Sequence, residues 1–255
     1  MTNSAHQESL ADLLICACSR VWAGDGEVLA SGIGLIPRLA ASLAMLRNPE
    51  LMMTDSEAYM VSEPVPVGPR GGYEPRRETW MGFSRIFENV WSGARHALVG
   101  PVQVDRYGQA NISAIGDYDQ PKVQMLGVRG FPGNSISHAN SFFVPSHSTR
   151  SFVSGEVDTV CSVGYHPERL PRGYTFDDID IRFIVTGLCV MDFCPDSRHP
   201  RLLSLHPGVE LGQVVENTGF ELLVAEELAE TASPSAEELE ILARLDPENL
   251  RYGAV

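Results

Sequence analysis

Residues 27–54 read EVLASGIGLIPRLAASLAMLRNPELMMT, and this stretch decides the fold class. The apolar run at 27–31 predicts a strand. The Gly32-Ile-Gly34 turn follows it, and Pro37 lies where the first turn of a helix tolerates proline. A second apolar run at 51–54 predicts the next strand. Strand, crossover helix and strand in this order are typical of an α/β sheet with parallel strands.

Outside this stretch, hydrophobic spacing predicts the remaining helices and strands. We expect helices at 6–21, 83–93, 210–218 and 237–245, and strands at 97–104, 111–115, 141–144, 159–163 and 181–191. Ser235, with Glu238 three residues later, has the spacing of a helix capping box. The order predicts one α/β domain over residues 1–255, with an open mixed or parallel sheet, helices on both faces and a C-terminal helical extension at about 234–255.

The charge of the chain limits its partners. With a net charge of −14, the chain does not have the basic character that binds nucleic-acid phosphates, and it matches an anionic membrane surface poorly. Residues 1–14 have no basic start, so we expect no secretory signal, and the apolar runs are too short to span a membrane. Five cysteines, an odd count, predict reduced thiols in a cytoplasmic protein. Cys16 and Cys18 have no matching Cys/His pair, so we expect buried helix residues and no metal site.

Gly32 and Gly34 allow two interpretations. Glycines between a strand and a helix let the backbone approach an anion, and the N–H groups of the helix N-terminus complete such a site. The other interpretation is a plain tight turn. The third glycine of a dinucleotide fingerprint is absent, so spacing alone favours the turn.

Residues 116–134, GDYDQPKVQMLGVRGFPGN, are polar and glycine-rich with little periodicity. A long irregular loop in a compact domain is usually functional or disordered, and the apolar strands on both sides argue against disorder. Gly127, Gly130 and Gly133 would present backbone N–H groups to a thioester oxyanion or a carboxylate, and Arg129 would hold a carboxylate in a bidentate pair. The alternative is a structural loop in which a neighbouring acid pairs with Arg129.

Four titratable residues are candidates for acid–base or covalent chemistry. His147 follows a predicted strand end, where it is either a general base or a hydrogen-bonded packing residue. Asp55, Glu57 and Glu63 follow the strand at 51–54, and ligands of α/β sheets bind beyond the carboxyl ends of strands. The alternative for these acids is a solvated surface. No serine-hydrolase elbow, zinc-protease or P-loop motif is present in the sequence.

Several of these segments together resemble one known family. Residues 100–111, GPVQVDRYGQAN, followed by 115–123, IGDYDQPKV, resemble the beta subunits of class I CoA transferases of the glutaconate type, in which a D-x-x-G-x-x-N hairpin precedes a Gly-rich loop. The segments at 141–153, 184–190 and 206–220 resemble later parts of the same family. The resemblance implies the open α/β fold of the family and a CoA-thioester substrate, with no cofactor because CoA is part of the substrate. It also implies an alpha-subunit partner in an α2β2 heterotetramer with the active site at the subunit interface. Gly32 and Gly34 would then contact CoA.

One departure from the family bears on the activity. The transferases use a beta-subunit Glu beside a Gly as their nucleophile, whereas residues 53–59 here read MTDSEAY. That position falls on Asp55 or a neighbour, and the shorter Asp withdraws the carboxylate by about one methylene. Glu57 reaches the same place only if the strand register shifts by one residue.

This departure, together with residues 127–134, resembles a divergent branch of the family, the beta subunits of steroid ring-cleaving hydrolases. In that branch the essential Glu belongs to the alpha subunit, so no catalytic residue of this chain is certain and Asp55 and Glu57 stay candidates. Gly127, Arg129, Gly130 and Asn134 would bind the carboxylate or oxo group of the substrate. The alternatives are a true CoA transferase that uses Asp55 or Glu57 covalently, and a subunit that binds or regulates without turnover.

Overall fold

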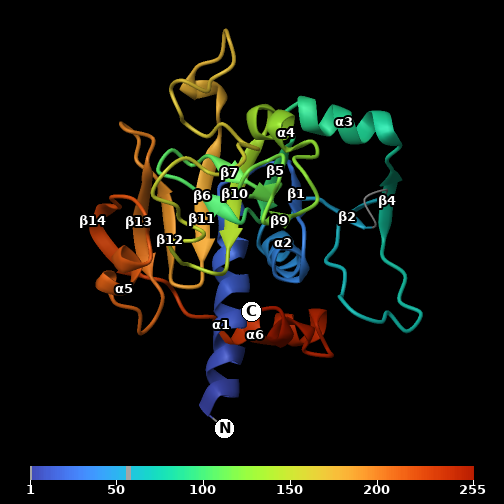
Figure 1. Cartoon of the computed structure of the whole chain (residues 1–255). Coiled ribbons are helices and arrows are strands. Elements are labelled where there is room, and N and C mark those ends of the chain that lie inside the picture. Colours follow the sequence, from blue (N-terminus) through green and yellow to red (C-terminus); the bar gives the residue numbers. More distant parts are fainter. Residues whose placement is uncertain (1, 56–58) are drawn as a thin grey trace. The chain divides into compact units, whose positions relative to one another are not determined.

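The computed structural model describes residues 2–55 and 59–255 (Figure 1). The chain divides into two compact units. The first comprises Met1–Leu98 and Ala232–Val255, and the second comprises Val99–Thr231. Whether the two units form the single domain expected for residues 1–255 stays a prediction.

The first unit contains most of the helices. Its helices are α1 (Thr2–Ser19), η1 (Arg20–Trp22), α2 (Leu35–Arg47), α3 (Phe83–Trp91), α6 (Ala236–Leu245) and η3 (Leu250–Gly253). Its strands are β1 (Leu29–Gly32), β2 (Met53–Asp55), β3 (Tyr59–Val61), β4 (Arg77–Trp80) and β5 (Arg95–Val99). β1 pairs in parallel with β5, and Leu29 also forms a parallel bridge with Met52. The predicted strand and the helix after it are therefore confirmed, and the predicted return in parallel is confirmed only at Met52.

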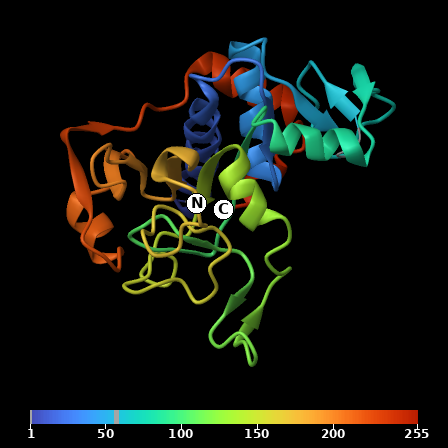
Figure 2. The ribbon, with the colours of Figure 1, turned by 90° about the horizontal axis from the view of Figure 1, so that it is seen from above.

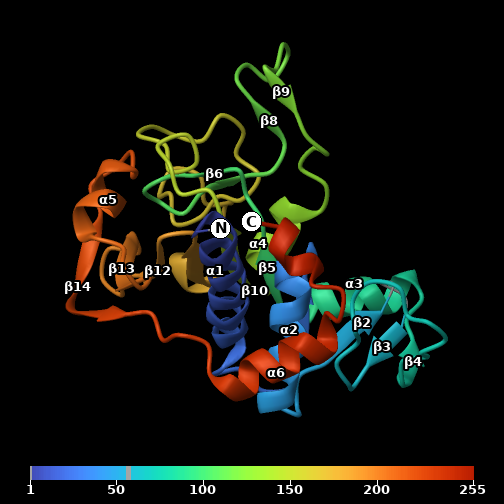
Figure 3. The same ribbon diagram turned by 90° about the horizontal axis from the view of Figure 1, so that it is seen from below.

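Immediately after Met52 the chain pairs with a different partner. β2 pairs antiparallel with β3, and β3 pairs antiparallel with β4, so these strands form a small separate sheet (Figure 3). The sequence interpretation treated residues 51–54 as one buried parallel strand. Only the bridge at Met52 has that geometry, and Asp55 ends the first strand of a hairpin.

The helices α1, α2 and α6 pack on one another, and α6 lies across α2 (Figure 3). Leu14, Leu39 and Leu43 are fully buried among them. The predicted capping box is confirmed, because the hydroxyl of Ser235 accepts the N–H of Glu238 at 3.2 Å while the Glu238 carboxylate accepts the N–H of Ser235 at 2.6 Å. α6 and η3 lie in the segment expected to be a helical extension.

The predicted burial of the α1 cysteines is also confirmed. Cys16 and Cys18 are fully buried. Burial raises the pKa of Cys16 to about 11 and raises that of Cys18 further. Both side chains act as small apolar core residues.

The second unit is built on a mixed sheet. Its strands are β6 (Gln103–Val104), β7 (Ala110–Asn111), β8 (Ala114–Ile115), β9 (Val123–Gln124), β10 (Ala139–Val144), β11 (Ile181–Thr186), β12 (Cys189–Phe193), β13 (Pro200–Leu205) and β14 (Leu223–Glu230), and its helices are α4 (Phe131–Ser137), η2 (Phe176–Asp178) and α5 (Leu211–Glu216). β10 and β11 are parallel, β11, β12 and β13 alternate in direction, and β13 and β14 are parallel. The predicted mixed α/β sheet is confirmed. Phe142, Ile184 and Met191 lie at the centre of its core.

Residues 97–104 and 111–115, each expected to form one strand, are each divided between two strands, β5 and β6 in the first case and β7 and β8 in the second. Two further strand predictions were wrong in the second unit. Residues 181–191 form two strands, because the chain reverses at Gly187, where a Cβ atom would lie 2.4 Å from the carbonyl oxygen of Pro145. Residues 159–163 form no strand and make only an isolated bridge between Ser162 and Ala110. Apolar β-branched residues occur in both segments, but backbone contacts from distant residues decide their conformation.

Within the described part of the chain, no helix has the length and apolar character needed to cross a membrane.

Candidate functional site

The D-x-x-G-x-x-N motif builds the turn that leads to the candidate site. One carboxylate oxygen of Asp105 accepts the N–H groups of Tyr107 at 2.9 Å and Gln109 at 3.1 Å. Gly108 has φ 69°, and a side chain there would collide with the ring of Phe193. Asn111 accepts the N–H of Ser113 at 2.9 Å. The motif is therefore structural, since each of its three residues shapes the β6–β7 turn or the exit from it.

The next segment, the β8–β9 hairpin, is anchored at its base and projects from the second unit (Figures 2 and 3). A carboxylate oxygen of Asp158 accepts the N–H of Gly116 at 2.8 Å and the side-chain amide of Gln103 at 3.1 Å. Residues 116–126, expected to be an irregular loop, thus include an ordered hairpin that leaves Tyr118 and Leu126 exposed.

The glycine-rich turn follows the hairpin and has an unusual backbone. Gly127 has φ 84°, Arg129 has φ 52°, and Gly130 has φ −87° and ψ 2°. When a residue in the left-handed backbone conformation is followed by one in the right-handed conformation, their successive N–H groups point to the same side. This backbone arrangement binds anions. Within residues 2–55 and 59–255, the N–H groups of Arg129 and Gly130 donate no hydrogen bond. Arg129 also carries the backbone strain of a non-glycine residue in the left-handed region, which is frequent at functional sites.

The predicted binding residues lie together in this turn. The Arg129 side chain is exposed, and no carboxylate of the described residues pairs with it. The amide group of Asn134 lies beside Gly130, with its oxygen 3.6 Å from the place of a Cβ atom on that glycine. Gly127, Arg129, Gly130 and Asn134 therefore form one cluster. The expected alternative, an arginine paired with a neighbouring acid, is not seen in the described residues. Gly133 lies within α4.

Two contacts hold this turn on the core. Phe131, the first residue of α4, is buried and packs edge-to-face on Phe142 with ring centroids 6.4 Å apart. The fully buried Asn140 donates its amide to the carbonyl oxygens of His138 at 2.7 Å and Asn134 at 3.4 Å. Sequence reasoning missed Asn140. The available signal was a polar residue near the start of a fully buried strand.

The candidate carboxylates belong to the first unit of the chain. Asp55 is the last residue of β2, where it pairs with Tyr59 of β3. Glu57 lies outside the described residues. Glu63 accepts the N–H of Arg76 at 2.9 Å and the hydroxyl of Tyr73 at 3.2 Å, so it holds its own loop together. Catalysis by Asp55 or Glu57 stays a prediction.

The geometry of the turn between β1 and α2 explains why Gly32 and Gly34 are glycines. A Cβ atom on Gly32 would lie 2.6 Å from the Cβ of Pro37, so only glycine permits this approach of strand and helix. Gly34 is the N-cap of α2 and has φ 102°. Both glycines are required by the turn itself, and their contact with CoA stays a prediction.

His147 is a packing residue in this structure. Its Nδ1 lies 2.9 Å from the hydroxyl of Thr186 and its Nε2 lies 3.0 Å from the hydroxyl of Thr218, while its ring stacks on Phe152 at 4.3 Å. Burial, with the nearby His206, lowers the pKa of His147 to about 4. Both ring nitrogens are therefore occupied in the neutral ring, which leaves neither free to act as a base.

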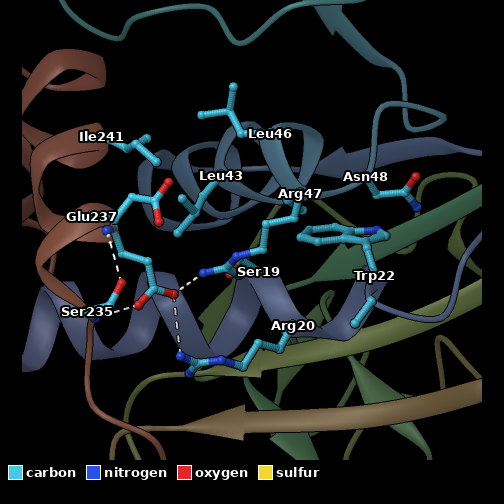
Figure 4. A pocket seen from close by; sticks show the side chains of 13 residues that line it. Ser19, Arg20, Trp22, Leu43, Leu46, Arg47, Asn48, Ser235, Glu237 and Ile241 are labelled. Atoms are coloured by element: carbon cyan, nitrogen blue, oxygen red, sulfur yellow. Dashed lines mark hydrogen bonds and ion pairs between the residues drawn. The ribbon is translucent and has the colours of Figure 1, made fainter.

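A pocket of about 480 Å³ lies in the first unit and contains none of the predicted site residues (Figure 4). Its two arginines are paired, because Glu238 pairs with both Arg20 and Arg47. Arg47 also donates to the hydroxyl of Ser19 at 2.7 Å. This cluster fastens α6 to α1 and α2, and it offers no uncommitted cation to a ligand.

Comparison with known proteins identifies relatives over nearly the whole chain. No protein-family model matches it. The chain is 38% identical over 253 residues to the cholesterol ring-cleaving hydrolase IpdB subunit of Rhodococcus jostii (strain RHA1), which covers 98% of each chain. The crystal structure of Rhodococcus jostii RHA1 IpdAB superposes with a TM-score of 0.87 at 37% identity, over 96% of this chain and 98% of that one. Glutaconate coenzyme A-transferase from Acidaminococcus fermentans superposes with a TM-score of 0.81 at 22% identity, over 95% and 96%.

The fold is thus that of the CoA-transferase B subunits, as the resemblance in the sequence implied. The chain belongs to the family of the cholesterol ring-cleaving hydrolase IpdB subunits.

Proposed function

We propose that this chain is the B-type subunit of a heteromeric hydrolase that opens the last steroid ring of a cyclohexenone-carboxyl-CoA in cholesterol or steroid degradation. Membership of the IpdB family supports the reaction class. The observation that carries the role of this chain is the exposed Arg129, which pairs with no carboxylate of the described residues and is held in a left-handed conformation inside a turn of backbone N–H donors. A cation and N–H groups in this arrangement bind a carboxylate or an oxyanion.

The proposed reaction is a hydrolytic carbon–carbon cleavage. Water adds to the ring ketone, and the bond between the former carbonyl carbon and the carbon alpha to the thioester breaks. The electron pair of that bond passes to the thioester enolate, which then takes a proton, while the ketone carbon becomes a carboxylate. Negative charge develops on oxygen in both steps, so N–H donors and a guanidinium group that favour this charge lower the barrier.

In this proposal the chain binds and the partner supplies the reacting carboxylate. Arg129, Gly130 and Asn134 hold the carboxylate or oxo group of the substrate, and a Glu of the A-type subunit activates water. The reaction requires no cofactor, because CoA is part of the substrate. We further propose an α2β2 assembly in the cytoplasm. The five free thiols are consistent with a reducing compartment.

The direct test is reconstitution with the A-type subunit from the same genome and mass spectrometry of cyclohexenone-carboxyl-CoA turnover in H₂¹⁸O. The proposal predicts a ring-opened CoA thioester with one ¹⁸O in its new carboxylate. Exchange of CoA onto a free carboxylic acid, with inactivation by hydroxylamine only when acyl-CoA is present, would instead identify a CoA transferase that uses Asp55 or Glu57.

A further inference from the structure

A ridge of aromatic side chains lies exposed on the first unit. Phe83, Phe87 and Trp91 are spaced four residues apart along α3, so they form one stripe. Trp80 adds a fourth ring from the end of β4. The exposed fractions are 62% for Trp80, 82% for Phe83, 47% for Phe87 and 73% for Trp91. We call these four residues the aromatic ridge.

The fold of α3 does not need this ridge. The helix is fixed to its unit by a different stripe, in which Val90 is buried and Ile86 is half-buried. Asn89 adds a contact to the sulfur of the buried Met81 at 3.3 Å. A nine-residue helix is marginal alone and usually turns its largest apolar face inward. Here the larger face points to solvent, which is the arrangement expected of a binding surface.

The ridge is already ordered. The rings of Phe83 and Phe87 stack with centroids 6.5 Å apart, and those of Phe87 and Trp91 stack at 5.8 Å. The Trp80 ring lies against Gly82, where a Cβ atom would be only 3.0 Å from it. Rings fixed in this way lose little side-chain entropy when a partner covers them.

The area of the ridge is that of an interface core. At about 200 Å² for a whole aromatic side chain, the four exposed fractions amount to roughly 500 Å² of bare ring surface. An apolar patch of this size on one chain is frequently functional. It is also more than half of the ~800 Å² that each partner buries in an interface of standard size.

Charge decides between the possible partners. The whole chain has a net charge of −14, so two copies repel each other. Residues 76–95, which contain the ridge, are locally basic, with four Arg against two Glu. Arg76 pairs with Glu78 and Arg95 donates to Ser31, so the segment does not share the negative charge of the whole chain, and its aromatic centre suits an apolar groove on a different chain.

We infer that the aromatic ridge is the docking surface for the A-type subunit. This inference rests on the proposed function only in taking the partner to be that subunit. The ridge inserts into an apolar groove of the partner, with Phe87 and Trp91 at the centre.

The test observes the ridge directly. The chain has three tryptophans, Trp22, Trp80 and Trp91, and Trp22 is fully buried. The chain alone is labelled with 5-fluorotryptophan and titrated with its unlabelled A-type subunit, and ¹⁹F resonances are recorded in H₂O and D₂O. We expect the Trp80 and Trp91 resonances to lose their solvent isotope shift when the complex forms, and the Trp22 resonance to stay unchanged.

Matched variants complete the test. Phe87→Glu or Trp91→Glu should weaken binding of the A-type subunit at least thirtyfold, the order of magnitude of a hot spot. Leu239→Glu, the same kind of change at an exposed apolar residue of α6, should weaken it less than about threefold. Circular dichroism and thermal melts confirm that each variant is folded, since none replaces a buried residue.

Three outcomes would overturn the inference. If the complex forms but Trp80 and Trp91 stay exposed to solvent, the aromatic ridge is not part of the interface. The proposed function is not affected by that result. Burial of both tryptophans by self-association of this chain contradicts the choice of partner. If no complex with the A-type subunit forms, both this inference and the heteromeric enzyme of the proposed function are wrong.

Discussion

The side-chain amide of Asn134 lies over Gly130, with its oxygen 3.6 Å and its nitrogen 3.7 Å from the place of a Cβ atom on that glycine. The N–H of Asn134 also donates to the carbonyl oxygen of Gly130 at 3.0 Å. One helical turn thus fixes the amide beside the N–H donors of the glycine-rich turn. Asn134 is therefore in place to donate to an anion that these groups hold.

An isosteric charge change at Asn134 tests this placement. Asn134→Asp keeps the shape but replaces the amide donor by a carboxylate, which repels a bound carboxylate. We expect KM for the CoA ester to rise at least tenfold, and to rise more than in Asn134→Ala, as measured by steady-state kinetics of the complex. Equal KM values for the two variants would mean that no anionic group of the substrate lies beside Asn134.

Two buried groups of the second unit should give opposite dependences of stability on pH. Burial lowers the pKa of His147 from 6.5 to about 4, so the unfolded chain binds the extra proton between these values. The stability linked to His147 is therefore present above pH 6.5 and is lost as the pH falls toward 4. Burial raises the pKa of Asp105 from 3.8 to about 6, so there the folded chain binds the extra proton. The stability linked to Asp105 is present below pH 3.8 and is lost as the pH rises to 6.

The two contributions, each about 3 kcal/mol, oppose each other between pH 4 and 6. In Asp105→Asn, the free energy of unfolding relative to wild type should rise with pH across this window. In His147→Asn, the same difference should fall with pH. Urea denaturation at pH steps from 4 to 7 measures both differences. Parallel curves for wild type and either variant would show that the replaced group does not titrate differently on folding.

The Glu238 cluster should contribute to stability without affecting binding. Glu238 caps α6 and pairs with Arg20 and Arg47, whereas the adjacent Glu237 lines the same pocket without any of these bonds (Figure 4). We expect Glu238→Ala to lower the free energy of unfolding by about 1–2 kcal/mol, and Glu237→Ala to change it by less than about 0.5 kcal/mol. Thermal melts give both values. Equal losses in the two variants would contradict the assigned role of Glu238.

The elements that depend on local sequence were predictable. The helix α2 and the capping box at Ser235 follow from spacing and cap chemistry, and the β6–β7 hairpin follows from the turn residues Asp105 and Gly108. The cluster of Arg129 and Asn134 was also predicted, because both residues belong to one short segment.

The features that depend on distant contacts were not predictable from one sequence. Gly187 splits the strand expected at 181–191 because the carbonyl of Pro145, more than forty residues earlier, occupies the space of a side chain. The packing role of His147 depends on hydroxyl groups of Thr186 and Thr218. The sequence showed the polar residues in both cases but not which of them meet.

The most direct measurement of the central claim is ring-opening turnover by the reconstituted complex with Arg129→Gly. Glycine keeps the left-handed backbone, so the variant should be as stable as wild type or more stable by up to about 1 kcal/mol. It removes the whole side chain, and with it the guanidinium group. We expect kcat/KM to fall about a hundredfold or more, while Arg150→Ala, at another exposed arginine of the second unit, stays near the wild-type value. A folded Arg129→Gly complex that turns over within threefold of wild type would contradict the claim that this turn binds the reacting substrate.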